Sequence, residues 1–469
     1  MSPPRNLPGA AEEIPWRSLA DAEFASHALP TVEAWLAQRQ IEQRLLVLLD
    51  DELHQRLTQQ RARRRRTGTG QQLAEVDLRP LCYLLLMAFD RACEAGGAGT
   101  LITRALRLAG LHALFCLLGA EPIAAPTWSH AHRMYGRAEG AADSMLVNDL
   151  GTSNDTLYLR MLLLSTIVGG GMTPRQIDKC FDWLEEWARG IALARTLDPE
   201  QHYFAVDLEA GAGLVPVGAG PMAAPRYFAH AGLAGRVAAS RSDYFRQISV
   251  TTLGLYASNP LFEYHEALHQ LSRYWEYINA RHTGGDTGRQ RVDGVQIAAE
   301  AGFDACCAAV HAGRTSMQWA LIDLSPTGAG FKVAGLARAV EKGALTLFIE
   351  PASQAWILGS AVRVVPGAQG GAIGVRRLAD SWRMIELGEE AADGASSARG
   401  VPGFFIFGDE ARGLSDSVLL KSGTFDPNRT YTMNPGAEVF RIRLSRVIQS
   451  AGDWERVGFD VLKRLKAQA

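Results

Sequence analysis

The sequence has little of what marks several large classes of protein. Its 469 residues carry a net charge of only −2, so no positive excess favours a nucleic-acid polymer as partner. The N-terminus lacks a positive stretch followed by an apolar run, so we expect no secretory signal. The apolar stretch Leu101–Leu118 contains Arg104 and Arg107, so we expect no transmembrane segment and a cytoplasmic protein.

Cysteine is also scarce, and its spacing argues against two kinds of site. The six cysteines form no Cys-x-x-Cys pair, so we expect neither a disulfide framework nor a cysteine-bound zinc ion. The Gly-rich stretches lack the Lys-Ser/Thr of a phosphate loop and the strand–helix setting of a dinucleotide fold, so we expect no cofactor. No clean internal repeat is visible, which argues against a solenoid.

The sequence does contain two halves with different periodicity. Through the first ~280 residues apolar side chains recur at helical spacing, for example from Ile177 to Ile191. Thr173-Pro-Arg-Gln176 has the pattern of a capping box with proline at the first helical position, so a helix is predicted to begin there. A loop-rich connection is predicted between Asp207 and Ser240, and a last amphipathic helix from about Asn259 to Ala280.

Beyond a Gly-rich linker at 282–288 the apolar period becomes two residues, which is typical of strands. The chain is predicted to end in a long hairpin that turns at Ser450–Asp453, followed by a short basic helix. We therefore expect a multidomain α plus β protein. It comprises a helical domain over 1–285, an antiparallel β-barrel over 286–395 and a further β unit over 396–469. The sequence leaves open whether the last unit is a second barrel or completes the first.

The segment from Trp319 to Lys332 is the most informative part of the chain. It is predicted to form a strand, a sharp turn and a second strand, with Asp323, Ser325 and Gly328 spaced as Asp-x-Ser-x-x-Gly. Asp and Ser side chains hold such turns by hydrogen bonds to the backbone. Gly328 and Gly330 are expected to supply backbone dihedrals that other residues resist.

This spacing resembles the PilZ domain family, which includes bacterial receptors for cyclic di-GMP. Arg289-Gln-Arg291 stands about thirty residues upstream, where the family carries an arginine-bearing arm. The segments Trp356–Val364 and Ile373-Gly374-Val375 are similar to the family's later strands. The resemblance covers roughly 286–395 and implies a small antiparallel barrel. A helical half joined to such a barrel is similar to some bacterial PilZ-containing proteins.

The resemblance implies a non-enzymatic receptor for cyclic di-GMP that signals through an unknown protein partner. Arg289 and Arg291 would clamp the ligand, while Asp323, Ser325 and Gly328 would shape the turn that cradles it. Arginine suits this role because its planar fork matches guanine O6 and N7 and stacks on bases. The family's arm normally reads Arg-x-x-x-Arg, which is absent here. An interaction scaffold that binds no nucleotide therefore stays open.

A rival motif indicates a different class of function. His265-Glu266-Ala-Leu-His269 is a literal His-Glu-x-x-His on a predicted helix, and in zinc proteases such histidines bind the metal while the glutamate activates water. A third ligand is not evident, because His282 lies in the Gly-rich linker and Glu276 is two turns further along the helix. A zinc-dependent hydrolase is kept as an alternative, although we expect the purified protein to hold no stoichiometric zinc.

Two lesser features are a basic run, Arg61–Arg66, and the pair His130 and His132. The basic run is expected to be an exposed helix end, with docking to an acidic partner or an anionic lipid surface as the alternative. The histidine pair lacks a carboxylate partner in evident register, which weakens a metal site there.

Overall fold

The fold is described from a computed structural model of the chain. It describes residues 16–465 except for 39–40, 68–75, 97–98, 120, 142–150, 168–171, 219, 230, 248–263, 273–274, 276–289, 326, 335–339, 368–369, 380, 391–395, 410–414 and 437. The chain divides into two compact units. The helical unit comprises Met1–Thr67, Gln71–Ala238 and Tyr274–His282, and the barrel unit comprises Gly68–Gly70, Ala239–Arg273 and Thr283–Ala469.

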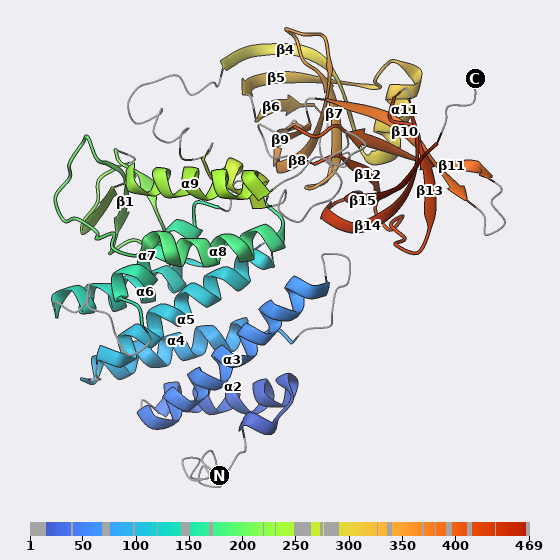
Figure 1. Ribbon diagram of the computed structural model, residues 1–469. Coiled ribbons are helices and arrows are strands. Elements are labelled where there is room, and N and C mark those ends of the chain that lie inside the picture. Colours follow the sequence, from blue (N-terminus) through green and yellow to red (C-terminus); the bar gives the residue numbers. More distant parts are fainter. Residues whose placement is uncertain are drawn as a thin grey trace. The chain divides into compact units, whose positions relative to one another are not determined.

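The helical unit is built mainly from α-helices that follow one another along the chain (Figure 1). After a short 3₁₀ turn, η1 (Trp16–Ser18), come α2 (Asp21–Gln38), α3 (Gln43–Thr67), α4 (Arg79–Glu94), α5 (Gly99–Leu118), α6 (Ala125–Gly140), α7 (Asn154–Leu164) and α8 (Pro174–Ala188). Helix α9 (Ala231–Gln247) spans the boundary between the two units. The helical half predicted from periodicity is confirmed.

Helix α5 forms the centre of this unit and packs against α4, α6, α7 and α8. Nearly all its side chains from Leu101 to Leu118 are buried. It is long and apolar enough to suit a bilayer by length and composition, but 83% of that stretch is buried inside the structure, as in a core helix. Gly110 of α5 lies against the ring of Phe181 on α8, with 3.8 Å from a Cβ built at Gly110 to that ring.

The predicted start of α8 is confirmed. Thr173 accepts a hydrogen bond from the Gln176 backbone at 3.1 Å, and the Gln176 side chain accepts one from the Thr173 backbone at 2.8 Å. The loop-rich connection expected after Asp207 is wrong in part. It contains β2 (Val215–Pro216) and β3 (Pro225–Ala229), which pair with β1 (His202–Asp207) in a small three-stranded antiparallel sheet, and then α9. These strands are too short for their alternation to show in sequence.

The barrel unit contains a first closed barrel of six antiparallel strands. They are β4 (Gln290–Ala301), β5 (Met317–Ser325), β6 (Gly328–Val333), β7 (Leu345–Ile349), β8 (Trp356–Gly367) and β9 (Gly370–Ala379), paired in the order β4-β5-β6-β9-β8-β7. Helix α11 (Phe303–Ala312) follows β4. The small barrel expected from the resemblance is thus present.

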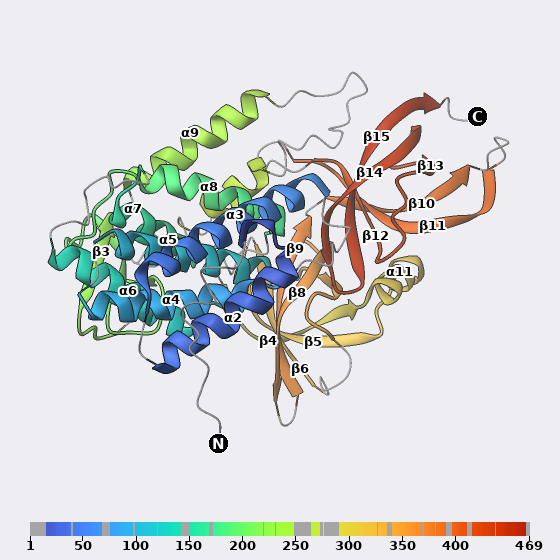
Figure 2. The same cartoon turned by 90° about the horizontal axis from the view of Figure 1, so that it is seen from below.

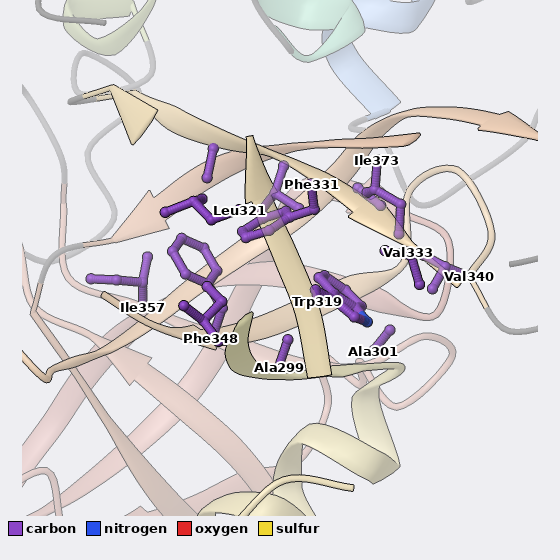
Figure 3. Close-up of a cluster of buried hydrophobic side chains, with 14 of the residues drawn as sticks. Ala299, Ala301, Trp319, Leu321, Phe331, Val333, Val340, Phe348, Ile357 and Ile373 are labelled. Carbon is purple, nitrogen blue, oxygen red and sulfur yellow. The ribbon is translucent and has the colours of Figure 1, made fainter. Parts of the chain in front are cut away.

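Alternating residues of these strands fill the barrel. Figure 3 shows Trp319, Phe331 and Phe348 inside it, and the Phe331 ring meets the other two edge to face at 5.3 and 5.2 Å between ring centroids. Leu321, Ile357 and Ile373 are buried in the same cluster. Since successive side chains of a strand point to opposite faces, the residues between these core positions face outward.

The last part of the chain forms a second closed barrel. Its strands are β10 (Trp382–Glu390), β11 (Ser396–Ile406), β12 (Ser417–Lys421), β13 (Thr430–Met433), β14 (Val439–Ala451) and β15 (Trp454–Leu465), paired in the order β10-β11-β12-β15-β14-β13. Counted from the first strand of each, both barrels have the order 1-2-3-6-5-4. The question left open by the sequence is answered, because the chain ends in a second barrel of the same topology.

Two details of the C-terminal half differ from the sequence analysis. Strand β10 belongs to the second barrel, so the boundary placed at 395/396 falls inside the β10–β11 hairpin of that barrel. The short basic helix expected at the end is wrong, because β15 continues as a strand to Leu465 and pairs with β14 along its length (Figure 2). The basic residues Lys463 and Arg464 lie in this ladder opposite Arg441 and Phe440.

The two barrels share a hydrophobic core. One buried cluster joins Phe303, Leu345 and Leu358 of the first barrel to Phe404 and Trp454 of the second. The β14–β15 turn adds polar contacts, since Asp453 accepts hydrogen bonds from the backbone N–H groups of Phe303 and Leu345. Trp454 Nε1 donates to the Gly343 carbonyl at 2.8 Å. The two barrels therefore pack directly against each other through this shared cluster.

Candidate functional site

The Asp-x-Ser-x-x-Gly segment forms the β5–β6 hairpin of the first barrel. Ser325 and Gly328 are the last cross-strand pair before the turn, which contains Thr327. The Ser325 hydroxyl donates to the Gly328 carbonyl at 3.1 Å and lies 3.3 Å from the Thr327 hydroxyl. The serine therefore fixes the hairpin locally, as its position in the motif predicts.

The two glycines of the hairpin are needed for a reason other than the one expected. Neither Gly328 nor Gly330 has a positive φ, so the prediction of unusual dihedrals is wrong. A Cβ at Gly328 would stand 2.1 Å from the Val375 carbonyl oxygen of β9. A Cβ at Gly330 would stand 2.7 Å from the nearer carboxylate oxygen of Asp323. The two glycines allow strand β9 and the Asp323 side chain to approach the β6 backbone closely.

Strand pairing aligns five residues in one row across the outer face of the barrel, here called the Asp323 row. Arg291 of β4 pairs with Asp323 of β5, which pairs with Gly330 of β6. Gly330 pairs with Gly374 of β9, and Gly374 pairs with Arg363 of β8. The adjacent residues Phe331, Ile373 and Val375 are in the barrel core, so the row faces away from it.

The middle of the Asp323 row is a floor of bare backbone. Gly330 and Gly374 present no side chains, and the Asp323 carboxylate extends over Gly330 from one side. A flat ring can approach such a surface closely. The floor, bounded by one carboxylate acceptor and by arginines at both ends, has the chemical elements needed to hold a purine base by its edges.

The charges around the floor are mostly positive and exposed. Arg291 and Arg363, at the two ends of the row, are exposed, and neither guanidinium group forms a hydrogen bond or ion pair with a side chain that the structure describes. Lys332 lies two residues beyond Gly330 on the same side of β6 and is also exposed. This local basic cluster can attract an anion although the net charge of the chain is only −2.

The structure brings together four of the five residues that the sequence analysis assigned to the ligand. Arg291 and Asp323 are a cross-strand pair, and Ser325 and Gly328 follow at the hairpin end. Arg289 lies outside the described residues, so its place in the site stays a prediction. Sequence reasoning did not place Gly374 and Arg363 in this row. Their only local signal was the strand pattern of β8 and β9, which does not reveal which residues pair.

The His-Glu-x-x-His motif lies on a helical segment, 264–272, of the barrel unit. His265 is 2% exposed, and burial lowers the pKa of its imidazole to about 4. The Glu266 carboxylate pairs with the buried Arg456 guanidinium of β15 at 3.3 Å and accepts from Gln270 at 3.4 Å. No group of three or more His, Cys, Asp or Glu side chains able to hold a metal occurs among the described residues.

Arg376 of β9 lies between the hairpin and this helical segment. It pairs in the sheet with Gly328, next to the Asp323 row. Burial lowers the pKa of its guanidinium, and the nearby Glu266 carboxylate opposes that shift. Arg376 therefore lies next to Gly328 at the end of the hairpin and within electrostatic range of Glu266 on segment 264–272.

The lesser candidates of the helical unit are engaged in structural contacts. Arg61 and Arg65 of the basic run form ion pairs with Asp178 and Asp182 of α8, so part of the run is not an open basic surface. His130 pairs with Asp90 at 2.7 Å, whereas His132 contacts the Tyr158 hydroxyl at 2.6 Å. The two histidines thus have different partners.

Comparison with known proteins gives a match within the helical unit. Residues 19–199 match the family model described as "Cyclic-di-GMP receptor FimW, N-terminal domain". This range contains α2 to α8 and ends before the first strand, β1. No curated protein and no solved structure shows significant similarity to the chain.

Proposed function

We propose that this protein is a non-enzymatic receptor for cyclic di-GMP that binds the nucleotide on the Asp323 row of the first barrel. The observation that carries the proposal is the row itself, in which a carboxylate and two arginines flank a floor made by Gly330 and Gly374. The match of residues 19–199 to a domain described as part of a cyclic-di-GMP receptor supports the same ligand from an independent part of the chain.

The chemistry of guanine suits this surface. Asp323 can accept hydrogen bonds from the N1–H and N2–H₂ groups of the base, while an arginine fork can donate to O6 and N7. The bare backbone of Gly330 and Gly374 receives the face of the ring. Arg291, with Arg289 in its arm, would pair with the phosphate diester charges.

The resulting signal would pass to a protein partner in the cytoplasm. Arg376 lies beside Gly328 and close to Glu266, so a dianionic ligand at this end of the row competes with the Glu266 carboxylate for the same positive charge. Ligand binding would thereby bias the contact of segment 264–272 with the barrels, because binding can shift only those states with which it interacts differently. The matched helical range, 19–199, is the proposed partner-binding part.

Calorimetric titration of cyclic di-GMP into the full-length protein tests the proposal, with GTP as the control ligand. We expect micromolar or tighter binding of cyclic di-GMP and at least roughly tenfold weaker binding by Asp323→Asn and Arg291→Ala. Absence of heat and of any thermal shift at saturating ligand would reject the receptor. The protein would then be an interaction scaffold, the reading that the missing Arg-x-x-x-Arg favours.

Metal analysis distinguishes the zinc hydrolase from both the receptor and the interaction scaffold. We expect purified protein to contain far less than one zinc per chain, since Glu266 is paired with Arg456. Zinc near one equivalent that is lost in His265→Ala would instead support the hydrolase and contradict the receptor as the main function.

A further inference from the structure

The arm before β4 reads Arg289-x-Arg291, so it lacks the four-residue spacing of a paired arginine clamp. The Asp323 row nevertheless has a second arginine, Arg363 of β8, at the end opposite Arg291. We propose that Arg363 of β8 is a specificity-determining residue that binds the O6/N7 edge of a guanine lying on the Gly330–Gly374 floor. This inference rests on the proposed function and deepens it.

A β-bulge aims Arg363 at the floor. Ala361 of β8 pairs with Val375 and is buried in the barrel, so regular alternation would turn Val362 outward and Arg363 inward. The pairing instead skips Val362 and resumes with Arg363 opposite Gly374. The extra residue thus reverses the direction of the arginine. Bulges next to binding sites are known to re-aim side chains in this way.

Arg363 lies close to the Gly330–Gly374 floor and is exposed. A Cβ built at Gly374 would lie 3.3 Å from the Arg363 Cβ and would meet no other atom within 4 Å. The arginine therefore borders the glycine directly, and no other described atom comes within 4 Å of that Cβ position. Val365, two residues further along the same face, is 40% exposed and adds an apolar surface beside the guanidinium.

The separation across the row fits a ligand held from two sides. Asp323 and Arg363 are three strands apart, about 14 Å at an inter-strand spacing of about 4.8 Å. The long arginine side chain can reach back over Gly374, whereas the short Asp323 side chain covers Gly330. The acceptor on one side and the bidentate donor on the other read different edges of one guanine.

The test compares Arg363→Ala and Arg363→Lys with wild type by calorimetric titration of cyclic di-GMP and cyclic di-AMP into the full-length protein. Arg443→Ala is the matched control, because Arg443 is an exposed arginine on β14, the strand of the second barrel that corresponds to β8. Circular dichroism of each variant checks that the barrels are folded.

We expect Arg363→Ala to bind cyclic di-GMP roughly ten- to hundredfold more weakly and to discriminate less against cyclic di-AMP, which lacks O6. Lysine should not restore discrimination, because it keeps the charge but not the fork. Arg443→Ala should bind like wild type.

Unchanged affinity and discrimination in Arg363→Ala, with wild type binding, would overturn the inference and leave the receptor standing. Rescue of both by lysine would also overturn it, because a simple charge would then suffice. If wild type itself fails to bind cyclic di-GMP, the proposed function fails and the role of Arg363 fails with it.

Discussion

Gly328 and Gly330 lie two residues apart on one short strand, yet different neighbours require them. The atom that a Cβ at Gly328 would meet is a backbone oxygen of β9, which cannot move without shifting the strand. The atoms that a Cβ at Gly330 would meet belong to the Asp323 carboxylate, which ends a rotatable side chain. Gly328 is therefore required for the packing of β6 against β9, whereas Gly330 leaves room for the Asp323 carboxylate in the candidate site.

Alanine at these two positions should therefore separate stability from binding. Gly328→Ala is expected to lower the free energy of unfolding by about 1–3 kcal/mol through overpacking against β9. Gly330→Ala should leave stability within about 1 kcal/mol of wild type, but should displace Asp323 and weaken cyclic di-GMP binding. Urea denaturation and calorimetric titration of both variants check this. Equal loss of stability in both would contradict the distinction.

A second residue-scale prediction concerns Asp416, which lies just before β12. It is 4% exposed, it accepts a hydrogen bond from the Gly408 backbone at 2.7 Å, and burial raises the pKa of its carboxyl to about 6. A carboxyl with a raised folded pKa binds its proton more tightly in the folded state. Its ionisation therefore destabilises the fold as pH rises from about 4 through 6.

The stability of wild type relative to Asp416→Asn should consequently increase by about 1–2 kcal/mol when pH falls from 7.5 to 5. Asparagine is the proper reference because it keeps an acceptor for Gly408 but cannot ionise. The comparison also cancels the opposite trend from buried histidines such as His132, whose pKa is lowered to about 4. Denaturant titrations of both proteins at the two pH values check the prediction, and a pH-independent difference would refute it.

Among the structural elements, the β14–β15 turn of the second barrel makes direct contacts with the first barrel. Its tip carries Asp453, whose carboxylate accepts from the backbone N–H groups of Phe303 and Leu345 in the other barrel. Gly452 and Gly343 meet backbone to backbone, since a Cβ on Gly452 would lie 2.6 Å from the Gly343 carbonyl carbon. The turn thus joins the barrels through main-chain contacts that side-chain repacking cannot replace.

Asp453→Ala should cost about 2–5 kcal/mol of unfolding free energy, because two partly buried N–H groups lose their acceptor. Asp460→Ala on β15, the strand that follows this turn, is the control, since its side chain is 48% exposed and its pair with Arg443 spans 3.7 Å. That exposed pair should contribute less than about 1 kcal/mol. Guanidinium denaturation followed by tryptophan fluorescence compares the two variants. Similar midpoints for both would argue against a stabilising role of the Asp453 hydrogen bonds.

The sequence predicted some elements well and others poorly. The difference depends on whether the interactions that form an element lie close together in the sequence. The α8 cap and the Asp323–Gly328 hairpin depend on residues within a few positions of each other, so they were predicted. The place of Arg363 in the Asp323 row was not predicted, because it depends on a bulge and on pairing with Gly374. The expected terminal helix failed because β14 supplies hydrogen-bonding partners for β15 that composition does not show.

For the whole molecule, the shared core implies that a ligand bound to the first barrel would also stabilise the second. Ligand at about 100 times its Kd should add about 2.7 kcal/mol to the free energy of unfolding. Since Phe303 and Trp454 belong to one buried cluster, the two barrels should unfold together. Hydrogen exchange should therefore slow in β14 and β15 as well as in β4 to β9 when cyclic di-GMP is added. Protection confined to β4–β9 would show that the barrels unfold independently.

The common strand order of the two barrels points to a gene duplication that sequence similarity between the barrels no longer shows. Duplication of one barrel-coding segment within a gene would leave two copies with the same connectivity, while their sequences diverged beyond visible repetition. In the first copy the β5–β6 connection stayed a tight hairpin, whereas in the second the β11–β12 connection runs from Ile406 to Ser417. Descent with specialisation would then leave one copy for the ligand and free the other to become its structural support.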